Sequence, residues 1–388
     1  MANLTVLKRN IHLSHAKQLA QLQLPTEHDI RREEPSSELL QTITKWITDN
    51  PGAIKAAQDS RCTSTGPDTP NWDAVFISLV ESTAMYLRQY PEVVKAAKAA
   101  RDGNLEQAAD HLKKAQEEID TVAALLNCTF LQLCDFVTQS PDGSPSLSGA
   151  FCGVFISNST ERPYMGIAYK GTSTNPEGIT DLVWAPIMPY RPGVAWGALM
   201  HAGFYQGLFG TFTTEVYGPQ VPFDLMLETL SSAYASRPSA QLHFTGHSLG
   251  GAYCIITYGE FLRRQAELAL ANFKFGDMHA FGAPRVCLEP FATEFNRHTQ
   301  IPGGGKYSFR IVNELDPVTT IPPAFKDQVL EFPFVHPASA WKITTGGPEK
   351  MNDEPPPVDP QSVTDLLANA HFHDPKEYYA SWQKTPHS

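Results

Sequence analysis

The chain has 388 residues, of which 42% are hydrophobic and 18% are charged, so it can bury a large core as one domain or as one domain with an appendage. Its formal net charge of −11 argues against nucleic acid or an anionic membrane surface as a standing partner. No stretch is apolar enough to predict an integral membrane segment. The N-terminus lacks the apolar block of a signal peptide, which predicts a cytoplasmic protein; the alternative is a secreted protein whose leader has been removed.

Helical periodicity dominates the chain from its start to about Ser140. Over Trp72–Tyr90 apolar residues recur on one helical face, and Pro91 then ends that helix and opens the next. A later stretch places leucine or isoleucine at every seventh position as far as Leu126, which also predicts helix. We therefore expect residues 1–148 to form a helical N-terminal region that packs on, or caps, the core.

From about Ser148 the pattern changes to the two-residue period of β-strands. Residues 150–156 and 164–169 predict a β-hairpin, and beyond it strands alternate with helices. This alternation predicts an α/β fold with a mostly parallel central sheet flanked by helices, which we assign to residues 149–388. The expected helices lie near 223–234, 252–268 and 291–297, and the expected strands near 242–245, 278–281 and 307–312. Residues 346–360 are rich in proline and predict a linker or surface excursion.

One turn in this α/β unit carries the strongest chemical signal. The pattern Gly246-x-Ser248-x-Gly250 lies between an apolar segment of strand length and a predicted helix, so Ser248 is expected on a strand-to-helix turn. Glycine is needed on both sides because a Cβ there would collide with the neighbouring strand or helix. Ser248 Oγ would then lie at a helix N-terminus, where backbone N–H groups favour developing negative charge. The alternative is a Ser-Gly turn that caps an ordinary helix.

A nucleophilic serine needs a base, and the base needs a carboxylate to hold it. In a fold of this kind the expected chain order is Ser, Asp, His, so both partners are sought after Ser248. Asp316 is the preferred carboxylate because it directly follows a predicted strand and precedes a proline. Glu314 and Glu331 are weaker rivals, and Asp316 could instead be an ordinary turn residue.

The candidate base is one of the histidines that follow the candidate acid. His373 lies just before a short predicted helix and is preferred, with His371 in the same loop as the alternative base. His336 and His387 are expected to be structural. The reaction also needs donors for an oxyanion: the backbone N–H of Leu249 is one, and the segment ending at Thr172, after an earlier strand, is placed to supply another.

In these residues and their order, the chain resembles the class 3 lipases, the family of fungal triacylglycerol lipases and plant phospholipase-A1-like enzymes with the α/β-hydrolase fold. The resemblance covers about residues 149–379 and rests on ordered blocks rather than on any one motif. The blocks are Tyr169-Lys-Gly-Thr172, Ile179-Thr-Asp181, His201-Ala-Gly-Phe-Tyr205, Thr245-Gly-His-Ser-Leu-Gly-Gly-Ala252, Phe281-Gly-Ala-Pro-Arg-Val286, and Arg310-Ile-Val-Asn313 with Asp316-Pro-Val318 and Ile321-Pro-Pro323.

The resemblance implies a role for each matching residue. Ser248 would be the nucleophile, Asp316 the acid, Thr172 and Leu249 the oxyanion donors, and Asp181 the buttress of the oxyanion hydroxyl. His373 is favoured over His371, because an aromatic residue follows it five positions on, as in the plant-type ending. The supporting residues of these blocks are Gly171, Gly246, His247 and Gly250.

The chain departs from the family where the lid should lie. Residues 173–178 read Ser-Thr-Asn-Pro-Glu-Gly, which is too polar and too broken by proline to form an amphipathic flap. Cover would have to come from the N-terminal helices or from residues 184–196. We therefore expect weak interfacial activation or none.

The sequence thus predicts a lipase or esterase that hydrolyses carboxylic acyl esters, with a lipid or related ester as substrate, and with no cofactor. The six cysteines are scattered without metal-ligand spacing, so we expect free thiols and no metal. The same site would suit a phospholipase A1, an acyltransferase or a lactone-forming enzyme. The alternative of another class is a non-catalytic interaction protein on a hydrolase scaffold.

Overall fold

The computed structural model describes residues 4–24, 35, 37–139, 145–171, 186–187, 193–214, 218–267, 272–321, 334–337, 339–351 and 368–387. The helices are α1 (Leu4–Leu19), α3 (Leu39–Asp49), α4 (Pro51–Asp59), α5 (Trp72–Ala84), η1 (Met85–Leu87), α6 (Tyr90–Arg101), α7 (Leu105–Ala115), α8 (Glu117–Leu125), η2 (Val194–Gly197), α10 (Ala202–Phe209), α11 (Pro222–Tyr234), α12 (Leu249–Arg263), α13 (Glu289–Thr299), η3 (Pro317–Thr320), η5 (Ala370–His373) and α15 (Pro375–Trp382). The strands are β1 (Cys128–Gln139), β2 (Pro145–Ser157), β3 (Tyr164–Tyr169), β4 (Pro186–Ile187), β5 (Met200–His201), β6 (Phe212–Thr214), β7 (Gly218–Gln220), β8 (Gln241–His247), β9 (Lys274–Phe281), β10 (Ser308–Asn313), β11 (Ser339–Thr344) and β12 (Gly347–Met351).

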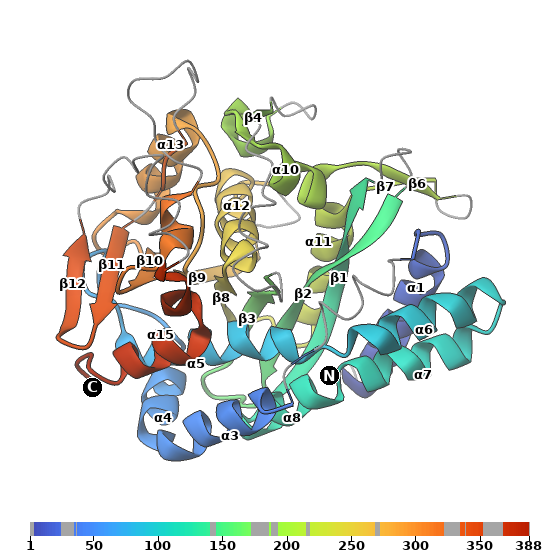
Figure 1. The fold of residues 1–388 in the computed structure, drawn as a ribbon, viewed down its shortest axis with the longest axis horizontal. Helices are drawn as coiled ribbons and strands as arrows, with labels where there is room; N and C mark the ends of the chain where they lie inside the picture. Colours follow the sequence, from blue (N-terminus) through green and yellow to red (C-terminus); the bar gives the residue numbers. More distant parts are fainter. Residues whose placement is uncertain are drawn as a thin grey trace.

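Within the described residues, eight strands form one sheet in the order β1-β2-β3-β8-β9-β10-β11-β12 (Figure 1). The five strands from β3 to β11 in this order run parallel. β1 and β2 at one edge and β12 at the other are antiparallel to their neighbours. The alternation of elements predicted this mostly parallel α/β sheet, and the resemblance implied the α/β-hydrolase fold that the chain has. The predicted hairpin of β2 and β3 is confirmed.

Helices cover both faces of this sheet, and each face has its own apolar core. α10, α11 and α12 cover one face, where Met226 and Ile255 join the same cluster as Ile167 of the sheet. α5, α3, α8 and α15 cover the other face, where Phe76 joins the same cluster as Phe309. Every residue of α5 is buried, and α5 contacts β3, β8 and β9. A helix from the N-terminal region is therefore part of the core beneath the parallel strands (Figure 1).

The structure corrects the sequence prediction at two places. The helix expected up to about residue 140 ends at Leu125, because Asn127 has a φ of 53° and reverses the chain into β1. β1 then pairs along its length with β2, so long-range pairing overrides the helical pattern. The linker expected over residues 346–360 begins instead with β12, which pairs with β11 through a tight turn before Gly347.

No helix in the described ranges is both long and apolar enough to cross a membrane. All six cysteines are buried and none is in a disulfide, as the sequence predicted. The same ranges contain no group of three or more His, Cys, Asp or Glu side chains that could hold a metal ion.

Buried neutral histidines should make this fold labile to acid. Burial lowers the pKa of His12 and of His279 to about 3 and that of His201 to about 4, from an ordinary 6.5. Because the pKa is lower in the folded state, the stabilising contribution of each histidine is complete above pH 6.5 and is lost as the pH falls. We expect the free energy of unfolding to fall by ~1.4 kcal/mol per pH unit for each such histidine below about pH 6.

Urea unfolding at about pH 7.5, 6 and 4.5 would measure this loss. The variant His279→Asn is the matched control, because it keeps a polar group near Ser78 Oγ, which lies 2.9 Å from His279 Nδ1, and it does not titrate. Its stability should fall less steeply with pH than that of the wild type. Equal stability of the wild type at all three values would contradict the prediction.

Candidate active site

Ser248 lies on a strained turn between β8 and α12. Its backbone has φ 60° and ψ −130°, a conformation that residues with a Cβ rarely adopt. A Cβ on Gly246 would lie 2.1 Å from the carbonyl oxygen of Gly250, and one on Gly250 would lie 2.2 Å from that of Tyr169. Both glycines are therefore required by close backbone packing, which is the steric argument made from the sequence.

The turn leaves the serine side chain at the start of a helix. Ser248 N–H donates to the carbonyl of Phe281 at 2.9 Å, which ties the turn to the end of β9. The Ser248 side chain does not cap α12, although Ser248 is the N-cap residue. Ser248 and Leu249 are both partly exposed. The hydroxyl is thus in reach of solvent at the positive end of the α12 dipole.

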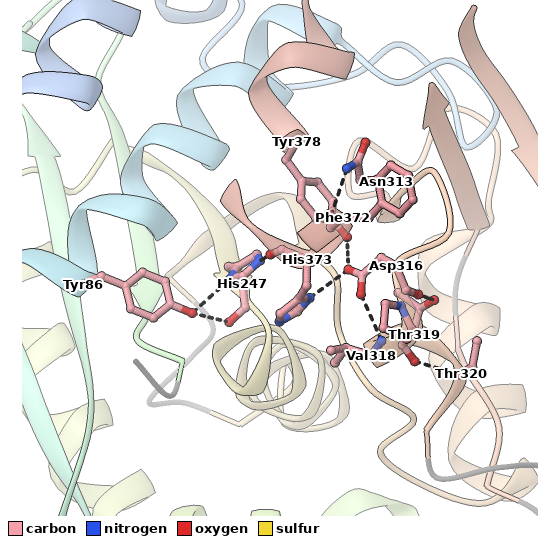
Figure 2. Close-up of polar contacts among 11 residues, drawn as sticks. Tyr86, His247, Asn313, Asp316, Val318, Thr319, Thr320, Phe372, His373 and Tyr378 are labelled. Atoms are coloured by element: carbon pink, nitrogen blue, oxygen red, sulfur yellow. Dashed lines mark hydrogen bonds and ion pairs between the residues drawn. The ribbon is translucent and has the colours of Figure 1, made fainter. Parts of the chain in front are cut away.

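Asp316 and His373 come together across 57 residues of sequence (Figure 2). His373 Nδ1 donates to Asp316 Oδ2 at 2.8 Å, and the Asp316 side chain is fully buried. The carboxylate also accepts from Tyr378 Oη at 2.5 Å and from the backbone N–H of Val318 at 2.9 Å. Three donors hold Asp316, and they leave its charge directed at the imidazole.

The other nitrogen of His373 has the form that a general base requires. Because Nδ1 carries the proton toward the carboxylate, Nε2 carries the lone pair in the neutral ring. Nε2 is buried and makes no hydrogen bond within the described structure. His247, the residue before Ser248, bonds through its Nε2 to the His373 carbonyl oxygen at 2.9 Å. This bond ties the loop of His373 to His247, the neighbour of Ser248 in the chain (Figure 2).

Each rival site residue lies elsewhere or in a different environment. His371 is exposed, and its ring packs at a tilt against Phe372, with ring centroids 4.0 Å apart. Glu314 accepts from the backbone N–H of Thr345. His336 is buried, and its Nε2 bonds to the carbonyl oxygen of Thr319 at 2.7 Å. Nδ1 of His387 lies 3.5 Å from Oδ1 of Asp73. Of the histidines that follow Asp316, the structure brings His373 to it. Glu331 lies outside the described residues.

The oxyanion side of the site is described in part. Gly171 lies directly beside the serine turn, since a Cβ on it would be 3.2 Å from Ser248 Cβ and 2.6 Å from the carbonyl oxygen of His247. Leu249 is in place as the first residue of α12. Thr172 and Asp181, and the expected lid at 173–178, lie outside the described residues.

Three residues of the site had no role in the sequence prediction. Tyr378 donates a hydrogen bond to Asp316. Tyr378 follows His373 by five residues, and this spacing is the sequence signal that could have predicted the contact. Asn313 donates to the carbonyl of Phe372 at 2.9 Å and accepts from Ser381 at 2.6 Å, so it joins the histidine loop to α15. Tyr86 bonds to His247 from the N-terminal region, and no local pattern indicates this contact.

Residues 166–326 match the family model described as lipase (class 3). The chain is 30% identical over 185 residues to a lipase of Rhizomucor miehei, an alignment that covers 48% of this chain and 43% of the relative. It is 27% identical over 195 residues to a lipase of Rhizopus niveus, with 50% of this chain and 42% of the relative covered. The chain therefore spans less than half of the length of these curated relatives.

Two solved lipase structures also show similarity to the chain. The Rhizomucor miehei lipase propeptide complex is 23% identical, with 57% of this chain and 58% of that chain covered and a TM-score of 0.39. Lipase II from Rhizopus niveus is 19% identical, with 69% of this chain and 80% of that chain covered and a TM-score of 0.41.

These relatives overturn the expectation of a cytoplasmic protein. Homologous lipases of Rhizomucor and Rhizopus are secreted enzymes with propeptides, so the prediction of a cytoplasmic location is wrong. That prediction rested on the first residues alone, whereas the similarity to lipases lies over the α/β unit. The chain is similar to the class 3 lipases over residues 166–326, a stretch that includes the glycine-flanked Ser248 turn.

Proposed function

We propose that the chain is a serine hydrolase of carboxylic acyl esters, with Ser248, His373 and Asp316 as its catalytic triad. One observation carries the proposal: His373 donates to the buried Asp316 through Nδ1, and its Nε2 is left unpaired beside the strained turn of Ser248. Similarity to the class 3 lipases over residues 166–326 supports ester hydrolysis and a lipid ester as the substrate class.

The reaction follows from the proton positions. His373 Nε2 takes the proton of Ser248 Oγ while the oxygen attacks the ester carbonyl carbon, and the carbonyl oxygen becomes an oxyanion. Asp316 stabilises the imidazolium that forms and keeps the ring in one tautomer. The proton then passes from Nε2 to the leaving alcohol, and the ester C–O bond breaks. Water repeats the sequence on the acyl-enzyme and releases the acid.

The oxyanion needs donors that are in place before the reaction. We propose the backbone N–H of Leu249, the first residue of α12, as one of these donors. Gly171 allows the end of β3 to approach the same turn, which supports the next residue, Thr172, as the second donor. The role of Asp181 in holding Thr172 rests on the resemblance to the family alone. Removal of one such donor costs ~10²–10³ in kcat in enzymes of this kind.

The substrate we propose is a glyceride or a similar acyl ester with a modest acyl chain. The polar sequence of residues 173–178 argues against a flap that opens on an oil surface. Phospholipid sn-1 cleavage would use the same acyl-enzyme with a different alcohol. Acyl transfer would differ only in the second nucleophile, an alcohol in place of water.

A series of p-nitrophenyl esters from acetate to palmitate tests this proposal. Rates are measured below and above the solubility limit of each ester. With glycerol present, the amount of free acid is compared with the amount of acylglycerol formed by acyl transfer. We expect the rate to peak at short or medium chains, with no jump at the solubility limit, and to yield mainly acid. A sharp rise on long chains once an interface forms would instead show a true interfacial lipase. Absence of turnover on every ester would overturn the proposed function.

A further inference from the structure

His247 occupies the centre of the site without belonging to the proposed triad. Its side chain is buried and makes two hydrogen bonds, each 2.9 Å long (Figure 2). One joins its Nε2 to the carbonyl oxygen of His373, and the other joins its Nδ1 to Tyr86 Oη. The same residue therefore contacts the loop of the proposed base on one side and the N-terminal region on the other.

The partners determine the proton positions on His247. A carbonyl oxygen can only accept, so Nε2 of His247 carries the hydrogen toward His373. Nδ1 then carries a lone pair, and the hydroxyl of Tyr86 donates to it. Burial, followed by the neighbouring His373, lowers the pKa of His247 well below its ordinary value, so the ring stays neutral and this single tautomer persists.

Tyr86 reaches the site from outside the α/β unit. It belongs to η1, which continues α5 at its C-terminal end, and α5 is buried against β3, β8 and β9. The Tyr86 hydroxyl lies 3.4 Å from the carbonyl oxygen of His247, and a Cβ on Gly171 would lie 2.3 Å from it. The hydroxyl is therefore packed between the serine turn and the end of β3, where the proposed oxyanion loop begins.

We propose that Tyr86 and His247 are positioning residues that form a relay from the N-terminal region to the backbone of His373. The proposal rests on the proposed function. By holding the His373 carbonyl, the relay keeps the imidazole at the distance from Ser248 that proton transfer requires, and it keeps the Gly171 segment against the turn. The region before residue 149 is then a working part of the site, not a separate cap.

Amide substitutions separate the two bonds of His247. Asparagine places its amide near the position of Nδ1, so His247→Asn can still accept from Tyr86 but loses the donor to His373. Glutamine places its amide near the position of Nε2, so His247→Gln keeps the donor to His373 but loses the acceptor for Tyr86. Tyr86→Phe removes only the hydroxyl. Tyr90→Phe is the matched control, since it removes the same group on α6, where Tyr90 Oη donates to the Leu147 carbonyl.

We expect kcat on a soluble ester to fall about 100-fold in His247→Asn, because the His373 imidazole is no longer held in position beside Ser248. In Tyr86→Phe and His247→Gln it should fall about 10-fold, the effect of one hydrogen bond. The double variant Tyr86→Phe with His247→Gln should fall no further than either single variant, since both remove the same bond. KM should stay within about twofold throughout, because substrate contacts are unchanged. Tyr90→Phe should match the wild type.

The thermal unfolding midpoint of each variant is measured to check that it folds. Ser248→Ala is assayed in the same series as the test of the proposed function. If His247→Asn does not fold, the test rests on Tyr86→Phe, provided that its thermal unfolding midpoint equals that of the wild type. An unchanged kcat in Tyr86→Phe would then overturn the relay. Equal losses in His247→Asn and His247→Gln, or additive losses in the double variant, would also overturn it. An active Ser248→Ala would instead refute the proposed function, so the two failures are distinguishable.

Discussion

Replacement of Ser248 by alanine is expected to lower kcat on a soluble ester by about 10⁴-fold to 10⁶-fold while the protein stays folded. The hydroxyl is the only group removed, and it neither caps α12 nor sets the backbone conformation, since alanine meets the same φ of 60° that serine does. Unfolding midpoints of variant and wild type should therefore agree within a few degrees. A serine-directed phosphonate should label the wild type once per chain and leave Ser248→Ala unlabelled.

The matched control is Ser232→Ala, which removes a hydroxyl from an exposed residue of α11. It should keep wild-type activity and labelling. Ester hydrolysis by Ser248→Ala within about tenfold of the wild type would remove Ser248 from the mechanism. If the wild type itself neither turns over esters nor reacts with the phosphonate, the alternative of a non-catalytic interaction protein gains support.

The second large effect is expected at the base. His373→Ala should lower kcat by about 10³-fold to 10⁶-fold, because no other group then accepts the serine proton. His371→Ala should stay within about threefold of the wild type, since His371 is exposed and its ring packs at a tilt against Phe372. Each variant removes a histidine side chain, and the two positions lie two residues apart in one short loop. A general disturbance of the loop would therefore lower the activity of both variants.

The acid partner provides an independent check on this assignment. Asp316→Asn leaves the shape of the site unchanged but removes the charge and disfavours the tautomer with the proton on Nδ1 of His373, and a fall in kcat of about 10⁴-fold is expected. Stopped-flow acylation with p-nitrophenyl acetate would place the loss in the first chemical step. The assignment of the base is falsified if His371→Ala loses as much activity as His373→Ala.

The sequence by itself determined the features of the site that depend on neighbours in the chain. Gly246 and Gly250 flank Ser248 because backbone atoms pass within ~2 Å of where a Cβ would be, and such steric rules are local and readable. The periodicity after residue 149 predicted β2, β3, β8, β9 and β10 and the helices α11, α12 and α13, whereas α10 and β12 were not predicted. The preference for Asp316 and His373 came from strand ends and block order, and the structure brings these two side chains into hydrogen-bond contact.

Only the tertiary structure decided which distant groups meet. β1 is a strand because β2 pairs with it, although the preceding residues carry a helical repeat. Tyr86 and His247 lie 161 residues apart, and Tyr378 reaches Asp316 across 62. No local periodicity encodes such contacts, because they arise when α5 and α15 pack on one face of the sheet and bring their polar side chains to the ends of β8 and β10. The sequence indicated the candidate reactive groups, and packing between remote helices decided which side chains contact them.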